Sequence, residues 1–182
     1  MSELVREWID CNSPLLLVAR DHLIAWEGTN VPSNGRKVEA CFRWNPDGPA
    51  TDYDRACDID DYLGVIDVGN GKGIVLGDAP LMTTWLPLPD GGLVVRWVFA
   101  EREEDLISSA LNIPIDDYED SGISLRISSS SLVLFAACES CEELLESRIE
   151  FDVAPGHYQI LTCKYDSEEL GLISHRLRRE SA

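Results

Sequence analysis

The densest group of side chains able to bind an ion is a run of aspartates between residues 51 and 61. Its members are Asp52, Asp54, Asp58, Asp60 and Asp61. Carboxylates at this density can hold calcium, but the EF-hand loop also needs a central glycine and a bidentate glutamate at its end. Ala56 and Cys57 occupy the middle of the run, and no glutamate closes it. The pattern therefore predicts an exposed acidic loop that faces water or a protein partner, and not a calcium site.

Six cysteines and three histidines are the other candidates for metal chemistry. Cys138 and Cys141 form a Cys-x-x-Cys pair, which supplies two of the four ligands of a structural zinc. His157, His175 and Cys163 would have to complete that site, because no second Cys-x-x-Cys and no His-x-x-His spacing occurs. A thioredoxin-like role would need a βαβ context, and no parallel-sheet pattern surrounds the pair. Two free thiols at the end of a strand are the favoured interpretation, so neither a metal nor another cofactor is predicted.

General acid–base or nucleophilic catalysis would most often use one of the histidines, His22, His157 or His175. No nucleophile elbow, zinc-protease helix, Walker loop or dinucleotide-binding fingerprint accompanies them. The glycine-rich stretch 69–73 joins two predicted strands and opens no helix, so it lacks the dipole of a phosphate-binding loop. The motifs therefore predict a protein that is not an enzyme.

The charge of the chain narrows the class of partner. Its 182 residues include 33 acidic residues against 15 Lys and Arg, which gives a net charge of -18. Such an excess opposes direct binding of nucleic acid and of anionic membranes, whereas a basic protein would be steered toward it. Solubility alone would also account for the charge. Because 45% of the residues are hydrophobic, one compact domain over residues 1–182 is expected.

The N-terminus has no basic region followed by an apolar stretch of signal-peptide length. The longest apolar runs, 14–19 and 132–138, are far shorter than the ~20 residues of a membrane-spanning helix. A cytoplasmic protein with reduced thiols is therefore expected.

Turn-forming residues recur at intervals of about one strand length, which predicts that β-hairpins position the candidate side chains. An Asn-Gly step separates the strands predicted at 63–68 and 73–76. The turn residues 89–92 separate the strands predicted at 83–88 and 93–99. A serine run separates the strands predicted at 123–127 and 132–135. Further strands are predicted at 14–18, 149–153, 157–164 and 172–177, and helices at 101–111 and 141–148. The predicted fold class is β-rich α+β, an antiparallel sheet built from hairpins with one or two short helices.

Large aromatic rings serve both cores and binding surfaces. Trp85 and Trp97 fall in facing hairpin strands, so core or cross-strand packing is predicted for them. Trp26 precedes Gly28 and Trp44 lies in a looser segment, so these two are expected to be half exposed. A second acidic group, Asp116, Asp117, Glu119 and Asp120, follows the predicted helix. The candidate partner-binding residues are therefore the two acidic groups with Trp26 and Trp44.

Short segments spread over nearly the whole chain carry a family resemblance. They are Trp8-Ile9, Pro14-Leu15-Leu16-Leu17, Trp26-Glu27-Gly28, Asp52-Tyr53-Asp54-Arg55-Ala56-Cys57, Asp60-Asp61-Tyr62-Leu63-Gly64, Leu76-Gly77-Asp78, Thr84-Trp85-Leu86-Pro87, Val94-Val95-Arg96-Trp97, Pro155-Gly156-His157-Tyr158 and His175-Arg176-Leu177. Together they resemble the bacterial immunity protein 21 family, although residues 30–45 do not align. The resemblance implies a β-rich cytoplasmic antidote encoded beside a polymorphic toxin, and it carries over no catalytic residue.

The leading interpretation is an immunity protein that neutralises a cognate toxin by stoichiometric binding through an acidic surface. The toxin would have a basic surface, and if it is a nuclease the carboxylates would occupy its phosphate sites. One alternative is a small metal-binding protein or enzyme that uses His157, His175 and the Cys138/Cys141 pair. Another is a scaffold module, which would self-associate instead of capturing one neighbour.

Overall fold

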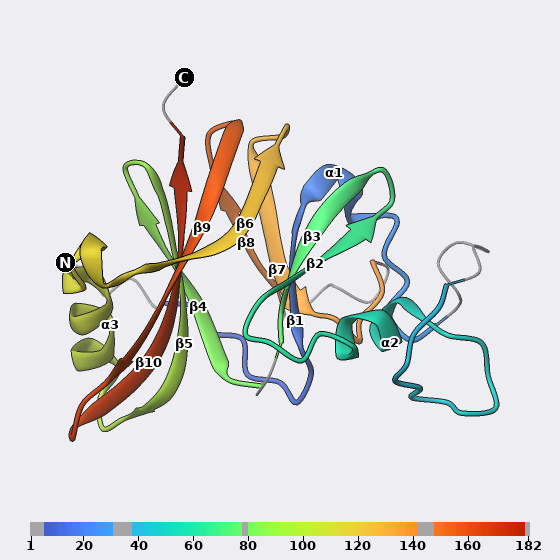
Figure 1. The fold of residues 1–182 in the computed structure, drawn as a ribbon, viewed down its shortest axis with the longest axis horizontal. Coiled ribbons are helices and arrows are strands. Elements are labelled where there is room, and N and C mark those ends of the chain that lie inside the picture. Colours follow the sequence, from blue (N-terminus) through green and yellow to red (C-terminus); the bar gives the residue numbers. More distant parts are fainter. Residues whose placement is uncertain (1–5, 31–37, 78–79, 142–147, 181–182) are drawn as a thin grey trace. The chain divides into compact units, whose positions relative to one another are not determined.

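The computed structural model describes residues 6–30, 38–77, 80–141 and 148–180. The chain forms two compact units, each built on an antiparallel sheet (Figure 1). Unit 1 is assembled from Met1–Asp10, Leu81–Arg126 and Gly156–Ala182, and unit 2 from Cys11–Pro80 and Ile127–Pro155. The chain therefore passes between the two units after residues 10, 80, 126 and 155. One domain over residues 1–182 stays a prediction.

The sheet of unit 2 has the strand order β2-β3-β1-β7-β8. The strands are β1 (Leu15–Ala19), β2 (Gly64–Val68), β3 (Gly71–Leu76), β7 (Ser131–Ala136) and β8 (Arg148–Asp152). All residues of β1 are buried, as its continuous apolar run predicts for a central strand. The predicted hairpin β2–β3 is confirmed, and Gly69 supplies the positive φ of 61° that its turn requires.

Two short helices belong to unit 2, α1 (Arg20–Leu23) and α2 (Asp52–Cys57). Tyr53 and Ala56 of α2 pack into a core formed by β1, β7 and the fully buried ring of Trp26. This packing places α2, which contains part of the aspartate run, on the hydrophobic core.

The sheet of unit 1 has the strand order β4-β5-β10-β9-β6. Its strands are β4 (Met82–Leu88), β5 (Gly91–Ala100), β6 (Glu119–Ile127), β9 (Gly156–Asp166) and β10 (Leu170–Arg179). Helix α3 (Glu103–Asn112) was predicted from its acidic first turn and helical apolar spacing, and its Leu106, Ile107 and Ala110 pack on the sheet. A 3₁₀ turn, η2 (Ile115–Asp117), leads from α3 to β6.

The prediction of a third hairpin over the serine run is wrong. Both strands exist, but β6 lies beside β9 in unit 1 whereas β7 lies between β1 and β8 in unit 2. The connection 128–130 has no glycine or asparagine to adopt the positive φ of a tight hairpin turn, so apolar packing decides the partner of each strand. Of the predicted helix 141–148, residues 142–147 lie outside the described residues, and Arg148 begins β8.

The predicted class, β-rich α+β with antiparallel pairing, is confirmed, with two sheets where one was expected. No helix in the described part of the chain is both long and apolar enough to cross a membrane.

The turn of the β4–β5 hairpin depends on Gly91, whose φ is 144° and whose missing Cβ would lie 2.0 Å from the carbonyl oxygen of Leu177. Gly91→Ala should therefore lower the free energy of unfolding by about 3 kcal/mol. Gly122→Ala is the matched control, because Gly122 also has a positive φ but a Cβ there meets nothing within 4 Å, so a loss of about 1 kcal/mol is expected. Urea denaturation measures both, and equal losses would contradict the close approach to Leu177.

Candidate functional site

Part of the aspartate run is helical and buried. Thr51 caps α2: its hydroxyl accepts from the Asp54 amide, and the Asp54 carboxylate accepts from the Thr51 amide at 2.7 Å. Asp52 is 0% exposed and Asp54 1%. The prediction of an exposed loop is therefore wrong for these two residues, because carboxylates in the first helical turn satisfy free amides and the helix dipole. Asp58, Asp60 and Asp61 are exposed, as predicted.

Carboxylates of this run also hold the preceding loop. The second oxygen of Asp54 accepts from the backbone amide of Trp44 at 2.7 Å. The Asp58 carboxylate accepts from the amides of Cys41 and Phe42 at 2.7 and 2.6 Å. Hydrogen bonds to a charged acceptor are short and strong. They therefore fix the backbone from which the side chains of Phe42 and Trp44 project.

Phe42, Trp44 and Tyr53 form what we call the aromatic ridge. The rings of Phe42 and Trp44 meet the Tyr53 ring edge-on, with centroids 6.3 and 6.0 Å away. Tyr53 is buried, whereas 41% of Phe42 and 65% of Trp44 is exposed. Large rings on a rigid support are typical of the residues that dominate binding energy at protein interfaces. The exposure predicted for Trp44 is confirmed, and Phe42 was not singled out from the sequence.

Trp26 was expected to be half exposed, and this prediction is wrong. Its ring is fully buried, its indole N–H donates to the carbonyl of Ala137 at 3.0 Å, and the Arg55 guanidinium lies 5.8 Å from its centroid. Arg55 also pairs with Asp52, whose other carboxylate oxygen accepts from the Glu27 amide. Trp26 and Asp52 are therefore buried residues that support α2.

A groove of about 410 Å³ lies beside the ridge. Trp44 and Tyr53 line it, together with Thr29 and with residues of 11–13 and 136–139. Among the described residues that line it, Glu139 alone carries a formal charge. Burial and the hydrogen bond that its hydroxyl donates to the Cys57 sulfur raise the pKa of Tyr53, so its phenol stays neutral. Burial also raises the pKa of the Cys57 thiol. Among its described lining residues the groove thus offers two aromatic rings and one carboxylate.

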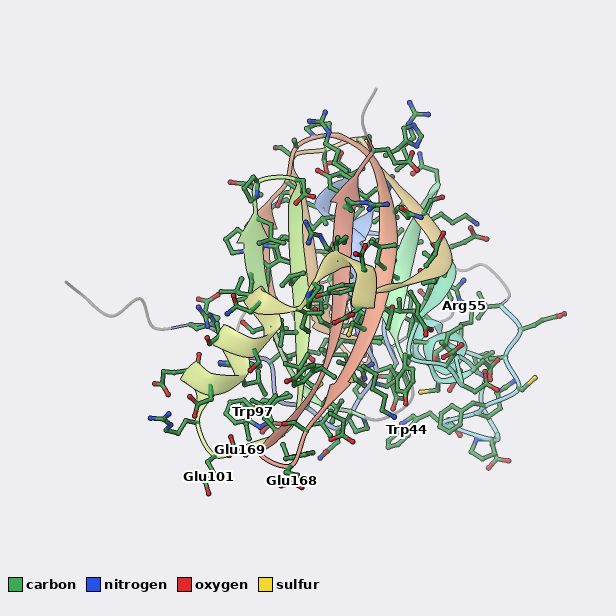
Figure 2. The ribbon with its side chains drawn as sticks, turned by 60° about the vertical axis from the view of Figure 1, so that its left-hand side comes forward. Trp44, Arg55, Trp97, Glu101, Glu168 and Glu169 are labelled. Carbon is green, nitrogen blue, oxygen red and sulfur yellow. The ribbon has the colours of Figure 1, made fainter. Side chains whose placement is uncertain are left out.

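Unit 1 has a separate acidic hollow of about 630 Å³ where the β9–β10 hairpin turns. Glu101, Glu168 and Glu169 line it, and Figure 2 shows them at one end of the sheet. Arg102 is also present but donates twice to Asp105 at 2.8 Å. Glu101 is distant in sequence from Glu168 and Glu169, and it lies near them because Leu170 pairs with Ala100. Sequence reasoning missed this group, and the signal available was the acidic turn 166–169 between two apolar runs.

The second predicted acidic group lies at η2 and the start of β6. Asp116, Asp117, Glu119 and Asp120 are all exposed. Asp120 accepts from the Gly122 amide at 2.9 Å and from the Gln159 amide group at 2.8 Å. Their role in binding a partner stays a prediction.

Comparison with protein families gives one match that covers both units. The model of immunity protein 21 matches residues 7–170. The chain belongs to the immunity protein 21 family. Comparison with curated proteins and with solved structures gives no match. Family membership confirms the resemblance seen in the sequence, and it implies a non-enzymatic role in which the immunity protein binds a toxin.

The side chains named for a metal or catalytic role are divided between the two units of this immunity protein. His157 and His175 lie on β9 and β10 of unit 1, where His175 is opposite Thr162, five residues beyond His157. Cys138 and Cys141 belong to unit 2 and pack against its core. Within the described ranges, no three His, Cys, Asp or Glu side chains gather as metal ligands. No observation therefore favours the metal or enzyme alternative.

The carboxylate of Asp54 should govern both stability and the order of the ridge. Asp54→Ala removes the carboxylate half of the capping box of α2 and leaves the amides of Thr51 and Trp44 without their acceptor, so the free energy of unfolding should fall by about 2–3 kcal/mol. Trp44 fluorescence should become more accessible to acrylamide quenching. Asp60→Ala, which alters an exposed aspartate of the same run, should change stability by less than ~0.5 kcal/mol. Unchanged quenching in Asp54→Ala would show that the carboxylate does not fix the ridge.

His175 should make the protein acid-sensitive. Burial and the charge of Arg96 lower its pKa from 6.5 to about 3, and its Nδ1 lies 3.0 Å from the Thr162 hydroxyl. Only the unfolded chain then binds a proton at this residue as the pH falls below about 6.5, so stability should drop by about 1.4 kcal/mol per pH unit.

Urea denaturation between pH 7 and pH 5 tests this effect. His175→Gln should lose the dependence, whereas His157→Gln, which alters an exposed histidine on the neighbouring strand, should keep it. If the free energy of unfolding depends on pH equally in the wild type and in both variants, other groups cause the effect.

Proposed function

We propose that this immunity protein binds a cognate polymorphic toxin in a one-to-one complex and neutralises it in the cytoplasm. The observation that carries the proposal is the family match over residues 7–170. Because the match includes segments of both units, we also propose that the two units act as one immunity-protein domain.

The aromatic ridge is the proposed centre of the interface. A stable complex of standard size buries about 1,600 Å² and draws most of its affinity from a few aromatic or charged residues. Phe42 and Trp44 are exposed, aromatic and fixed by Asp54 and Asp58 before any partner arrives. Side chains that are already ordered lose little conformational entropy on binding.

The exposed carboxylates are proposed to steer a toxin with a basic surface toward the protein. They include the acidic hollow of unit 1 and the predicted residues that are exposed, namely Asp58, Asp60, Asp61, Asp116, Asp117, Glu119 and Asp120. With a net charge of -18, long-range attraction to a basic partner accelerates association. If the toxin is a nuclease, these carboxylates would compete for its phosphate sites.

Co-expression with the protein encoded by the adjacent reading frame tests the proposal. Host growth should be rescued, and the two chains should co-purify in equal amounts. A harmless neighbour, or a toxic one that this chain neither rescues nor binds, would overturn it.

In the purified complex, Trp44→Ala should weaken binding by about 2 kcal/mol, roughly 30-fold in Kd, mainly through faster dissociation. Ile24→Ala is the matched control, because Ile24 is also a large exposed apolar side chain of unit 2 but lies outside the ridge. Calorimetry gives the Kd of each variant, and surface-binding kinetics give its dissociation rate. Equal affinity of the Trp44→Ala variant and the wild type would remove the ridge from the interface.

A further inference from the structure

We infer that a hollow at the C-terminal end of α3, which we call the helix-end hollow, receives a lysine side chain of the toxin. The toxin as the source of the lysine rests on the proposed function, whereas the preference for a lysine rests on the hollow itself. The helix-end hollow belongs to unit 1 and has a volume of about 320 Å³. Its described lining residues are Ser108, Ser109, Asn112, Ile113, Pro114 and Tyr165.

Helix α3 has no cation of its own at this end. The carbonyl groups at the end of a helix carry a partial negative charge, which Lys and Arg side chains commonly balance. The first turn of α3 contains three acidic residues, but its last turn contains no basic residue. The Asn112 side-chain amide donates to the Ser108 carbonyl at 2.8 Å. The last four carbonyls of a helix have no donor within it, so the helix-end hollow opens beside backbone acceptors that suit a cationic donor.

The charges near the helix-end hollow also favour a cation. No formally charged residue is among the described residues that line it. Asp116 and Asp117 are exposed on η2, which follows the end of α3. Burial raises the pKa of the Cys163 thiol, and the nearby carboxylates of Asp117 and Glu119 raise it further. Cys163 lies two residues before Tyr165 on β9, so the field of these carboxylates reaches the hollow, where it attracts cations and repels anions.

The acceptors of the helix-end hollow favour lysine over arginine. A guanidinium gains most from a carboxylate that accepts two parallel hydrogen bonds, and no carboxylate is among the described lining residues. An ammonium group has three donors, each of which can meet a separate oxygen. The hydroxyls of Ser108 and Ser109 and the last carbonyls of α3 provide such oxygens. Tyr165 is 38% exposed and offers apolar surface to the aliphatic stem of the lysine.

The backbone on both sides of the helix-end hollow is held in place before binding. Ala110 and Ile113, at the end of α3, pack into the hydrophobic core of unit 1. Tyr165 pairs with Leu172 in the ladder between β9 and β10. A site whose backbone is already ordered binds a side chain with little loss of conformational entropy.

The test uses the free immunity protein and a tripeptide, acetyl-Gly-Lys-Gly-amide, at constant ionic strength. Binding is followed by NMR through the side-chain amide of Asn112 and the backbone amides of 109–113. These signals should shift in a saturable way, and the indole signal of Trp26 in unit 2 should stay in place. The same peptide with norleucine, whose aliphatic side chain has no charge, should bind at least ~10-fold more weakly. The arginine peptide should also bind more weakly than the lysine peptide.

Ser108→Lys supplies the helix-end hollow with a cation from this chain. Ser108 is exposed and lines the hollow, so the variant should fold and should bind the lysine peptide at least ~10-fold more weakly through like-charge repulsion. Ser124→Lys is the matched control, because it adds the same charge at an exposed serine on β6 of the same unit. It should change the affinity by less than ~2-fold, since distant exposed charges are screened. Equal losses in the two variants would assign binding to the overall charge and overturn the inference.

The absence of a saturable shift at Asn112, or equal binding of the lysine and norleucine peptides, would also overturn the inference. Tighter binding of the arginine peptide would overturn the choice of lysine. Because the titration contains no toxin, its failure leaves co-expression rescue intact, whereas failure of rescue with a positive titration removes the proposed function and retains the cation site. In the purified complex, Ser108→Lys should bind the toxin about tenfold more weakly than Ser124→Lys, and equal affinities would exclude a toxin lysine from the hollow.

Discussion

The buried carboxylate of Asp54 is the interaction on which the exposed surface of unit 2 depends. It accepts from Thr51 at the start of α2 and from Trp44 in the preceding loop. Burying a charge is costly unless hydrogen bonds replace its hydration, and here two amides and the helix N-terminus do so. Helix α2 has only six residues and would not persist alone. The cap and the Tyr53 side chain in the core together hold it, and with it the ridge.

The acidity of the chain therefore has two separate physical roles. Asp52 and Asp54 are buried and stabilise local structure, and Asp58 is exposed but still binds the amides of Cys41 and Phe42. The other exposed carboxylates, some of which also form ion pairs, contribute to the electrostatic field around the protein. A strongly negative field raises the rate of encounter with a cation, whereas affinity depends on closely packed, desolvated contacts. Steering and tight contact thus come from different residues.

Local sequence signals predicted the elements well and their long-range relations poorly. The β2–β3 and β4–β5 hairpins and α3 follow from turn residues, apolar period and acidic first turns, which act over a few residues. By contrast, β6 and β7 join different sheets because each strand packs on a different hydrophobic core. The local sequence of the two strands does not show which core each will join. The same limit applies to Trp26 and Asp52, since their partners Ala137, Arg55 and Glu27 are known only from the fold. The resemblance to the family spans the chain and was confirmed because it does not depend on any one of these contacts.

The shifted pKa values of Cys57, Cys163 and His175 fit packing better than catalysis. Catalysis by a thiol requires a lowered pKa, and general acid–base catalysis requires a group that titrates near neutral pH. The opposite shifts occur here: burial raises the pKa of Cys57 and Cys163, and it lowers that of His175 to about 3. These groups stay neutral at physiological pH and serve as packing residues. The protein also exposes aromatic rings whose backbone is held by Asp54 and Asp58, and under the proposed function this surface binds a complementary cationic one.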